Sequence, residues 1–378
     1  MITNEQYDAS SVSCRPLFVV VLAASCKVSG ASDPPSPFDG MRESGVGATR
    51  FEQLCSSPLR VRLQSDSPVL SSVGSVDIDP KFGVLVTDPI EKRVFQFSFN
   101  GSALRTFGGP GTHPGEFRDL TDAVFIEQGR VLALDRHKGL TLYDKEGAVL
   151  RAQMGESFSG GTMLAHLSEH RIIVGAGNPG VLPSSPQYLV RVWALDSARP
   201  LSSFGQETWE HLRGFNLFRG VTVAADPSGT VVVVAVPYEL GFGFFRPNGV
   251  QIGSWKGHLD EYLPPRPQAR QFVNRSEADR WIISSSYLSA VSLLDSTSIL
   301  FSWESYEGLR RHHHLALYSR SNNEIRSLGE VPYRFLRGIG DTLLFLDASL
   351  GPRYDVIACR GWSGGDNVIR RSQVGSLR

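Results

Sequence analysis

The chain of 378 residues has no excess charge of either sign, because 38 Lys and Arg residues balance 38 Asp and Glu residues. This balance creates no long-range field that would attract nucleic acid or an acidic membrane, so neither partner is expected. The motifs Gly-x-Ser-x-Gly, His-Glu-x-x-His and Cys-x-x-Cys are also absent. The sequence therefore carries no short signature of serine-hydrolase, zinc-protease or thiol-redox chemistry.

The apolar run at residues 16–24, which follows Arg15, is too short to cross a bilayer as a helix. It is typical of the hydrophobic region of a secretory signal peptide. The following Ser-Cys pair resembles the end of the lipobox of bacterial lipoproteins, which implies lipidation at Cys26. Residues 1–26 are thus predicted to be a signal peptide, and the Ser-, Gly- and Pro-rich residues 27–50 a flexible tether.

A signal peptide places the folded part outside the cytoplasm, periplasmic or secreted, or held to a membrane only through a lipid anchor. Hydrophobic residues make up 41% of the chain, charged residues 20%, and there are 38 glycines. This composition is typical of a soluble globular protein that is rich in turns.

Short strands separated by turn residues recur along the chain. The first unit has predicted strands at residues 73–77, 84–88, 93–99 and 103–107. The second has them at residues 123–126, 131–135, 140–144 and 149–151. A third copy spans residues 220–255, and weaker copies span 163–205 and 288–329. A repeat of about forty residues is the signature of a β-propeller.

The last copy, residues 333–360, offers only three strands. Its fourth strand is predicted to come from residues 59–64. The prediction is an all-β fold over residues 51–361, a six-bladed β-propeller of four-stranded antiparallel blades. An N-terminal strand that pairs with the last blade closes the ring and protects the sheet edges. Residues 362–378 form a C-terminal tail.

The glycine-rich stretch at residues 103–117, ALRTFGGPGTHPGEF, resembles the junction between blades in NHL-repeat propellers. Asp88 and Asp135 match the Asp that this family places at the end of the second strand. A phosphate-binding loop would instead need a helix directly after its glycines. Because residues 119–126 are strand-like, we interpret the glycines as a junction.

The chain has only four cysteines. Cys14 would leave with the signal peptide and Cys26 would carry lipid, so Cys55 and Cys359 remain. Antiparallel pairing of the closing strand with residues 354–358 would bring these two together, and we predict a disulfide. The alternative is two unpaired buried thiols.

Loop length predicts which face of the propeller carries a site. The 1–2 and 3–4 turns are tight, whereas the 2–3 loops and the 4–1 junctions between blades carry the long insertions. These insertions are residues 175–186, 205–216, 256–286 and 304–312. Long loops on a rigid scaffold usually hold the binding residues, so we expect the site on this face and at the mouth of the axial channel.

Arg118, Arg219 and Arg337 each open an inner strand. If these positions are equivalent, the three guanidinium groups converge on the channel and can bind a carboxylate or phosphate. The alternative is that each pairs with a nearby acid, such as Asp119, Asp122 or Asp341.

Further candidates lie in the long loops. Trp209 and Arg266 could form a wall for a glycan or peptide. His211 and His258 have acidic neighbours and could act as general acid or base, or could simply be solvated. Of the three consecutive histidines at residues 312–314, at most two can face one ion, and the adjacent arginines repel a cation. No metal or cofactor is therefore expected.

These features favour a monomeric, non-catalytic scaffold that binds a protein, peptide or glycan. The alternative is a propeller enzyme of the lyase or lactonase type with a metal-assisted axial site. Such sites draw His, Asp, Glu or Asn from several inner strands, whereas the predicted inner strands here offer Asp77, Asp122 and arginines.

Overall fold

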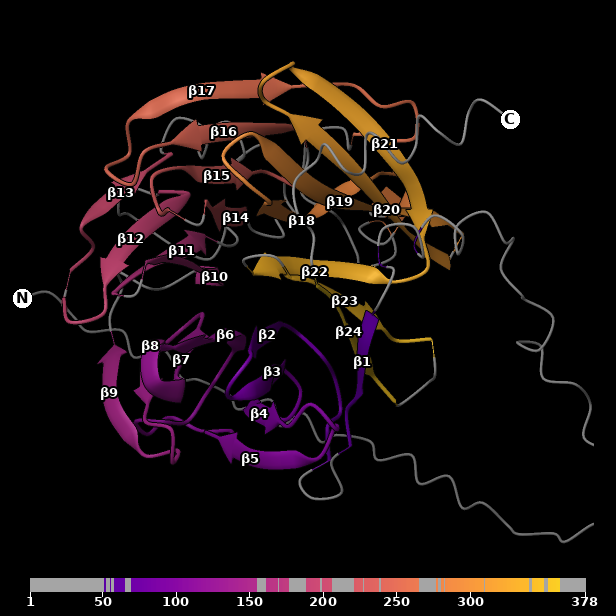
Figure 1. The fold of residues 1–378 in the computed structure, drawn as a ribbon. Helices are drawn as coiled ribbons and strands as arrows, with labels where there is room; N and C mark the ends of the chain where they lie inside the picture. Colours follow the sequence, from indigo (N-terminus) through magenta and orange to yellow (C-terminus); the bar gives the residue numbers. More distant parts are fainter. Residues whose placement is uncertain are drawn as a thin grey trace, which may run out of the picture. The chain divides into compact units, whose positions relative to one another are not determined.

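Six four-stranded antiparallel sheets form the computed structural model of the protein, and they surround a common axis (Figure 1). The structure describes residues 51, 55, 58–64, 69–154, 161–168, 170–176, 188–197, 199–205, 221–226, 228–237, 239–264, 277, 280–281, 283–308, 310–339, 342–349 and 353–360. The predicted all-β six-bladed propeller is confirmed. The predicted signal peptide, Cys26, the tether and the C-terminal tail lie outside the described residues.

Five blades are built from consecutive strands, with the first strand of each at the axis. Blade 1 contains β2 (Val76–Asp79), β3 (Gly83–Asp88), β4 (Arg93–Phe97) and β5 (Ala103–Phe107). Blade 2 contains β6 (Leu120–Ile126), β7 (Arg130–Asp135), β8 (Gly139–Tyr143) and β9 (Val149–Met154). Blade 3 contains β10 (Gly161–Ser168), β11 (Arg171–Ala176), β12 (Val190–Ala194) and β13 (Ser202–Phe204). Blade 4 contains β14 (Thr222–Ala225), β15 (Val232–Ala235), β16 (Gly241–Phe245) and β17 (Gln251–Lys256).

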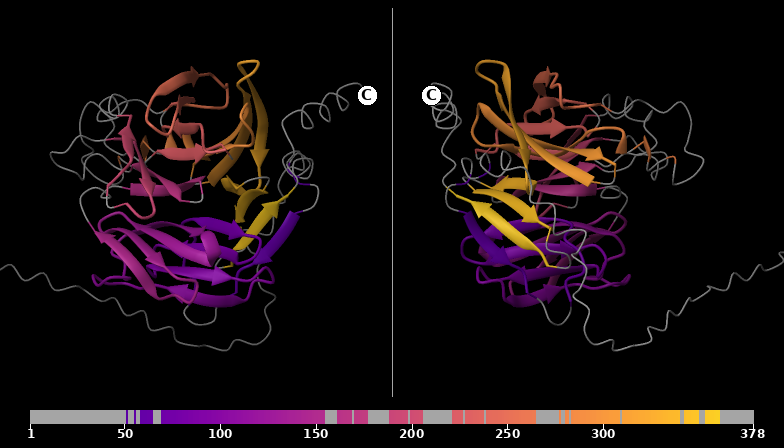
Figure 2. Two further views of the ribbon diagram at one scale, coloured as in Figure 1. Left: turned by 60° about the vertical axis from the view of Figure 1, so that its left-hand side comes forward. Right: turned by 90° about the vertical axis from the view of Figure 1, so that its right-hand side faces the viewer.

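Blade 5 contains β18 (Tyr287–Leu293), β19 (Ser298–Glu307), β20 (Arg310–Ser319) and β21 (Glu324–Val331). The sixth sheet contains β22 (Arg334–Ile339), β23 (Thr342–Asp347), β24 (Asp355–Cys359) and β1 (Pro58–Arg62) as its outer strand. The side views show each blade as a twisted sheet (Figure 2). No helix in the described part of the chain has the length and apolar character needed to cross a membrane.

The core lies between the blades. The described residues form six hydrophobic clusters, and each lies mainly between two neighbouring blades around the ring. All six residues of β3 are buried, as are all six of β23, because these strands pack against blades on both faces. Each blade is therefore stabilised mainly by its neighbours, as expected for a repeat architecture.

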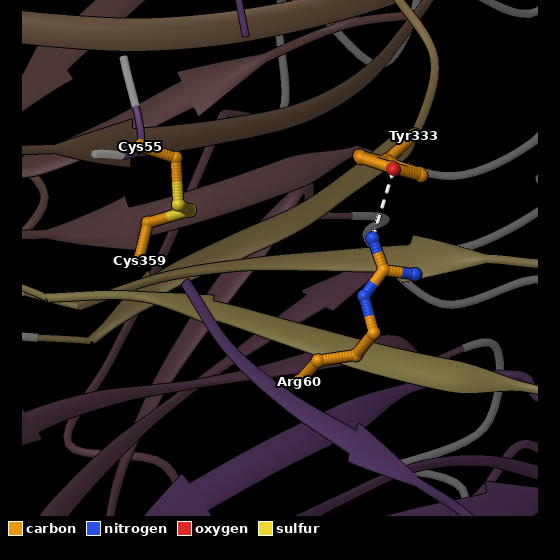
Figure 3. Close-up of a disulfide and its surroundings, with 4 residues drawn as sticks. All are labelled: Cys55, Arg60, Tyr333 and Cys359. Atoms are coloured by element: carbon orange, nitrogen blue, oxygen red, sulfur yellow. Dashed lines mark hydrogen bonds between the residues drawn. A yellow bond between two sulfur atoms is a disulfide. The ribbon is translucent and has the colours of Figure 1, made fainter. Parts of the chain in front are cut away.

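The sixth sheet brings the two ends of the described chain together. Strand β1 pairs antiparallel with β24, with Pro58 opposite Cys359 and Arg62 opposite Asp355. The sulfur atoms of Cys55 and Cys359 are joined, and the two Cα atoms are 5.3 Å apart, within the range that a disulfide requires (Figure 3). The predicted pairing of these two cysteines is thus present in the structure. Arg60, which lies on β1, donates a hydrogen bond to the hydroxyl of Tyr333 at 2.9 Å.

The glycine-rich stretch is a blade junction, as predicted. It connects β5 to the strand β6 rather than to a helix. Gly108 has a φ of 70°, and a Cβ atom there would lie 2.2 Å from the ring of Phe117. The position therefore requires glycine because the backbone is left-handed and the buried ring fills the space beside it.

Two buried aspartates at the end of a second strand hold such junctions through hydrogen bonds. Asp135 accepts hydrogen bonds from the backbone amides of Arg118 and Asp119 with one oxygen, and from those of His137 and Lys138 with the other. Asp88 makes the same four-bond pattern in blade 1. The Asp of the family pattern thus has a structural role here.

One predicted insertion is wrong. Residues 304–312 were expected to form a long loop, but they belong to the extended hairpin of β19 and β20, whose pairing continues to Glu307 and Arg310. The alternation of polar and apolar side chains in this segment is compatible with either a loop or the solvated end of a hairpin.

Candidate functional site: the axial cavity

A cavity of about 490 Å³ lies on the propeller axis, between the first residues of the six inner strands. It is lined from blade 1 to the sixth sheet by Ser75, Val76, Thr121, Asp122, Thr162, Met163, Thr222, Tyr287, Ser289, Arg334, Leu336 and Arg337. Inner strands begin on the face that carries the 4–1 junctions and the 2–3 connections. The cavity therefore lies at the end of the axis where the sequence predicted a site.

Hydroxyl groups from five blades line this cavity. The residues are Ser75, Thr121, Thr162, Thr222 and Ser289. Three of them, Thr121, Thr162 and Ser289, lie where the register of the inner strand shifts by one residue. A β-bulge of this kind redirects a side chain, and bulges are frequent beside binding sites.

The hydroxyls are held by the second strand of their own blade. Thr121 Oγ1 donates to the carbonyl of Leu134 at 3.1 Å, and Ser289 Oγ lies 2.8 Å from Ser302 Oγ. In blade 1, Ser75 Oγ lies 2.9 Å from Thr87 Oγ1. A hydroxyl that donates one hydrogen bond still has acceptor capacity, so the fixed hydroxyls of the wall can accept hydrogen bonds from a ligand.

Two arginines at the cavity are paired with acids. Arg136 Nη1 lies 3.1 Å from Asp119 Oδ2, while its buried Nε has no hydrogen-bond partner in the part of the chain that the structure describes. Arg334 Nε lies 3.3 Å from Oε1 of Glu304, whose side chain is 3% exposed. Arg311 also lies near this carboxylate, at 3.6 Å. The cavity wall is therefore polar but close to neutral.

The three consecutive histidines point to three different surroundings. His312 Nδ1 lies 2.8 Å from Glu330 Oε1, and His314 Nε2 lies 2.8 Å from Ser305 Oγ. Burial lowers the pKa of His313 to about 4; Glu304 opposes this shift, while Arg334 and Arg311 add to it. His313 is therefore neutral near pH 7. Across the described residues, no three His, Cys, Asp or Glu side chains form a group that could hold a metal ion.

The predicted three-arginine anion site requires correction. Nη2 of Arg337 lies 2.8 Å and 2.9 Å from the two carboxylate oxygens of Asp122, and both side chains are buried. Burial alone would lower the pKa of Arg337, but the charges of Asp122 and Asp77 raise it above its ordinary value. Arg337 is thus engaged by an acid, the alternative that the sequence left open, and it forms the floor of the cavity.

The assumed register was also wrong. Arg118 lies two residues before the start of β6, whereas Arg337 is the fourth residue of β22, so the two positions are not equivalent. Arg118 is exposed, and its backbone amide is held by Asp135. Arg219, the third member, lies outside the described residues.

The other predicted site residues are not brought together. Trp209, His211 and Arg266 lie outside the described residues. His258 is described, and its side chain is 81% exposed with Nε2 3.3 Å from Asp260 Oδ1, so it is a solvated loop residue that stands apart from the axial cavity.

Sequence reasoning missed the hydroxyls, together with Arg136, Arg334 and Glu304. One signal could have revealed the hydroxyls: a Ser or Thr stands just before the apolar core of the inner strand in five copies of the repeat. The arginine–carboxylate pairs join different strands, and no local spacing predicts them.

Comparisons with known proteins extend the description of the fold. No protein-family model and no curated protein matches the chain. Among solved structures, the chain is similar to a member of the DUF4221 family from Bacteroides vulgatus ATCC 8482, with 9% sequence identity and a TM-score of 0.56. That alignment covers 81% of this chain and 97% of the other.

A second similar structure is regucalcin, a calcium-binding protein from Agrobacterium tumefaciens str. C58. The identity is 12% and the TM-score 0.48, over 80% of this chain and 96% of the other. At identities this low the likenesses show the fold alone. This chain is a six-bladed β-propeller, and its function has to be argued from its own residues.

Proposed function

We propose that this protein is a non-catalytic propeller that works outside the cytoplasm as a monomer and binds a hydroxyl-rich ligand of the glycan type in its axial cavity. The observation that carries the proposal is the set of hydroxyls that five blades direct to one cavity. Sugars are recognised by fixed donors and acceptors spaced around a pocket, and a wall of hydroxyls with two arginines offers both.

The extracytoplasmic location is supported by two independent features. The Cys55–Cys359 disulfide is typical of oxidising compartments. The basic residue and apolar run at residues 15–24 are typical of a signal peptide. Attachment to a membrane through a lipid at Cys26 belongs to the same proposal.

The charged groups favour binding over catalysis. Asp122 and Glu304 are the buried carboxylates of the cavity, and each is neutralised by an arginine. A general acid or a metal ligand would need a carboxylate with a free oxygen that faces the ligand. The enzyme alternative, a lyase or lactonase with a metal at the axis, therefore has less support from these residues.

Titration calorimetry of the folded protein with a panel of mono- and disaccharides tests the proposal. We expect saturable binding of at least one sugar. Thr121→Val and Ser289→Ala should each weaken it by about fivefold, since a hydrogen bond contributes about 1 kcal/mol. Thr222→Phe should also weaken binding, because it removes a hydroxyl and its ring occupies part of the cavity.

Ser321→Ala is the control, because this exposed serine lies in a turn outside the cavity lining and its loss should leave binding unchanged. No saturable binding of any sugar, or binding that the three cavity variants do not alter, would refute the proposed ligand class.

A further inference from the structure

A second cavity, of about 190 Å³, lies on the axis beyond the Arg337–Asp122 pair. It is lined by later residues of the inner strands, among them Asp77, His166, Asp226, Ser292 and Gly338. Arg337 and Met163 line both cavities and so mark the level that separates them. Because the inner strands run from the first cavity to the second, the second one lies toward the face that carries the tight 1–2 turns. We call it the lower cavity.

The lower cavity contains a carboxylate whose hydrogen bonds are incomplete. Asp77 is 2% exposed, and its Oδ2 accepts a hydrogen bond from the backbone amide of Phe125 at 2.7 Å. Its Oδ1 is buried and lacks a hydrogen-bond partner among the residues that the structure describes. A buried carboxylate oxygen without a donor is costly, so its environment favours a ligand that can donate.

Two buried carboxylates, Asp77 and Asp122, share one arginine at this level. Arg337 donates its hydrogen bonds to Asp122 and interacts with Asp77 only through its charge. The cationic candidate on the other side is His166, whose Nε2 lies 3.9 Å from Asp77 Oδ2, too far for a hydrogen bond. Asp226 also lines the cavity, but its Oδ1 accepts hydrogen bonds from the amides of Thr230 and Val231, and its Oδ2 accepts from the hydroxyls of Thr230 and Ser228.

The rest of the wall is largely aliphatic. It includes Leu164, Ala165, Val223, Ala225, Val291 and Leu293. A carboxylate with an unfilled hydrogen bond beside these aliphatic side chains matches a ligand with one positive end and a hydrocarbon body. A metal ion would need several further ligands, and no suitable group of three acidic, His or Cys side chains occurs in the described part of the chain.

We propose that the lower cavity binds the protonated amino group of a small organic amine, with Asp77 as its counter-ion. The ammonium supplies the hydrogen bond that Asp77 Oδ1 lacks and adds a positive charge where two carboxylates share one arginine. The aliphatic residues contact the carbon part of the ligand. This site is separate from the one proposed for sugars, because the Arg337–Asp122 pair lies between them.

The test uses propylamine and benzylamine hydrochlorides as probes, with 1-propanol and benzyl alcohol as neutral counterparts. Saturation-transfer NMR and calorimetry at pH 7.5 on the folded protein should show saturable binding of at least one amine and none of the matching alcohol. Asp77→Asn keeps the acceptor for Phe125 but removes the charge, and it should weaken amine binding by at least about tenfold. Asp79→Asn, at the half-buried end of the same strand and outside the cavity lining, is the matched control and should bind like the wild type; its amide oxygen can still accept the hydrogen bonds from the amides of Lys81 and Phe82.

Ala225→Leu is a second variant, which keeps every charge and narrows the lower cavity. It should also lower the affinity for the amine. If Asp77→Asn does not fold, this variant tests the amine site in its place. Absence of binding by both amines would overturn the proposal, as would equal binding of the alcohols or full binding by these variants. Sugar binding should be the same in Asp77→Asn as in the wild type, so failure of the amine site is distinguishable from failure of the sugar site.

Discussion

Arg337 and Asp122, which are 215 residues apart in the sequence, form a buried ion pair on the axis of the propeller with N–O distances of 2.8 Å and 2.9 Å. The pair joins blade 2 to the sixth sheet across the ring and closes the channel between two cavities. Asp122 Oδ2 also accepts a hydrogen bond from the amide of Leu164 in blade 3. Three blades are therefore held at this one point.

Removal of one member of this pair should be strongly destabilising. Arg337→Met leaves a buried carboxylate without its counter-ion, and we expect a loss of about 3–5 kcal/mol in the free energy of unfolding. The double variant Asp122→Asn with Arg337→Met also removes the charge that Arg337→Met leaves on Asp122, so it should be more stable than Arg337→Met alone. Urea unfolding followed by tryptophan fluorescence measures both, and equal stability of the two variants would contradict this account.

His313 should make stability depend on pH. Burial lowers its pKa to about 4 in the folded protein, whereas the unfolded value is about 6.5. Between these values the unfolded chain binds a proton that the folded one does not. The free energy of unfolding should therefore fall by roughly 2–3 kcal/mol as the pH drops from about 6.5 to about 4, and this contribution should be flat below that range.

His313→Gln is the matched variant for this titration. Its stability between pH 6.5 and 4 should decrease less than that of the wild type, by an amount equal to the contribution of His313. Chemical denaturation at a series of pH values gives both curves. If the two curves of unfolding free energy against pH are parallel, a group other than His313 causes the pH dependence.

The disulfide should stabilise the ring mainly through the unfolded state. It joins residues 304 apart, and the chain-entropy relation gives a contribution of roughly 6 kcal/mol for a loop of this size. Cys55→Ser with Cys359→Ala should lower the unfolding free energy by at most this amount. Guanidinium unfolding measures this free energy for the oxidised protein, the reduced protein and the double variant. If reduction does not change the unfolding free energy, the strand pairing of β1 with β24 alone accounts for the closure.

Asp135 should be important for stability but not for binding. Its carboxylate accepts four backbone hydrogen bonds at 2.6–2.9 Å from two connections of blade 2. Asp135→Ala leaves these amides without their acceptor, and we expect a loss of about 2–4 kcal/mol. Thermal unfolding should show the loss, whereas the affinity for a sugar, measured well below the transition, should change little. Glu146→Ala, at an exposed position in a turn of the same blade, is the control.

The fold was predictable because its signals are local. Alternating strands, turn residues and the Asp that ends the second strand repeat in the sequence, so the blades follow from short segments such as residues 83–107. The placement of Cys55 beside Cys359 followed from the antiparallel direction of two strands. Both inferences depend only on the repeat in the sequence and on the direction of the paired strands.

The site was less predictable because it depends on register at the axis. A one-residue shift in register between Phe335 and Arg337 redirects the side chains of β22, and no local sequence pattern predicts that shift. The partner of Arg337 then comes from another blade, as does the acid that pairs with Arg334. These ion pairs form only when the blades are assembled into a ring, so the sequence of a single strand does not predict them.

The pairing of β1 with β24 also has a consequence for biosynthesis. Five blades consist of consecutive strands, but the outer strand of the sixth sheet is made about 300 residues before its partner. At roughly 5–20 residues per second, that interval is about 15–60 s. Until β24 pairs with it, β1 is an unpaired edge that can add to another sheet. The sixth sheet is therefore the part of the ring that waits longest for its partner strand, and under the proposed export the two cysteines join only after both have reached the oxidising compartment.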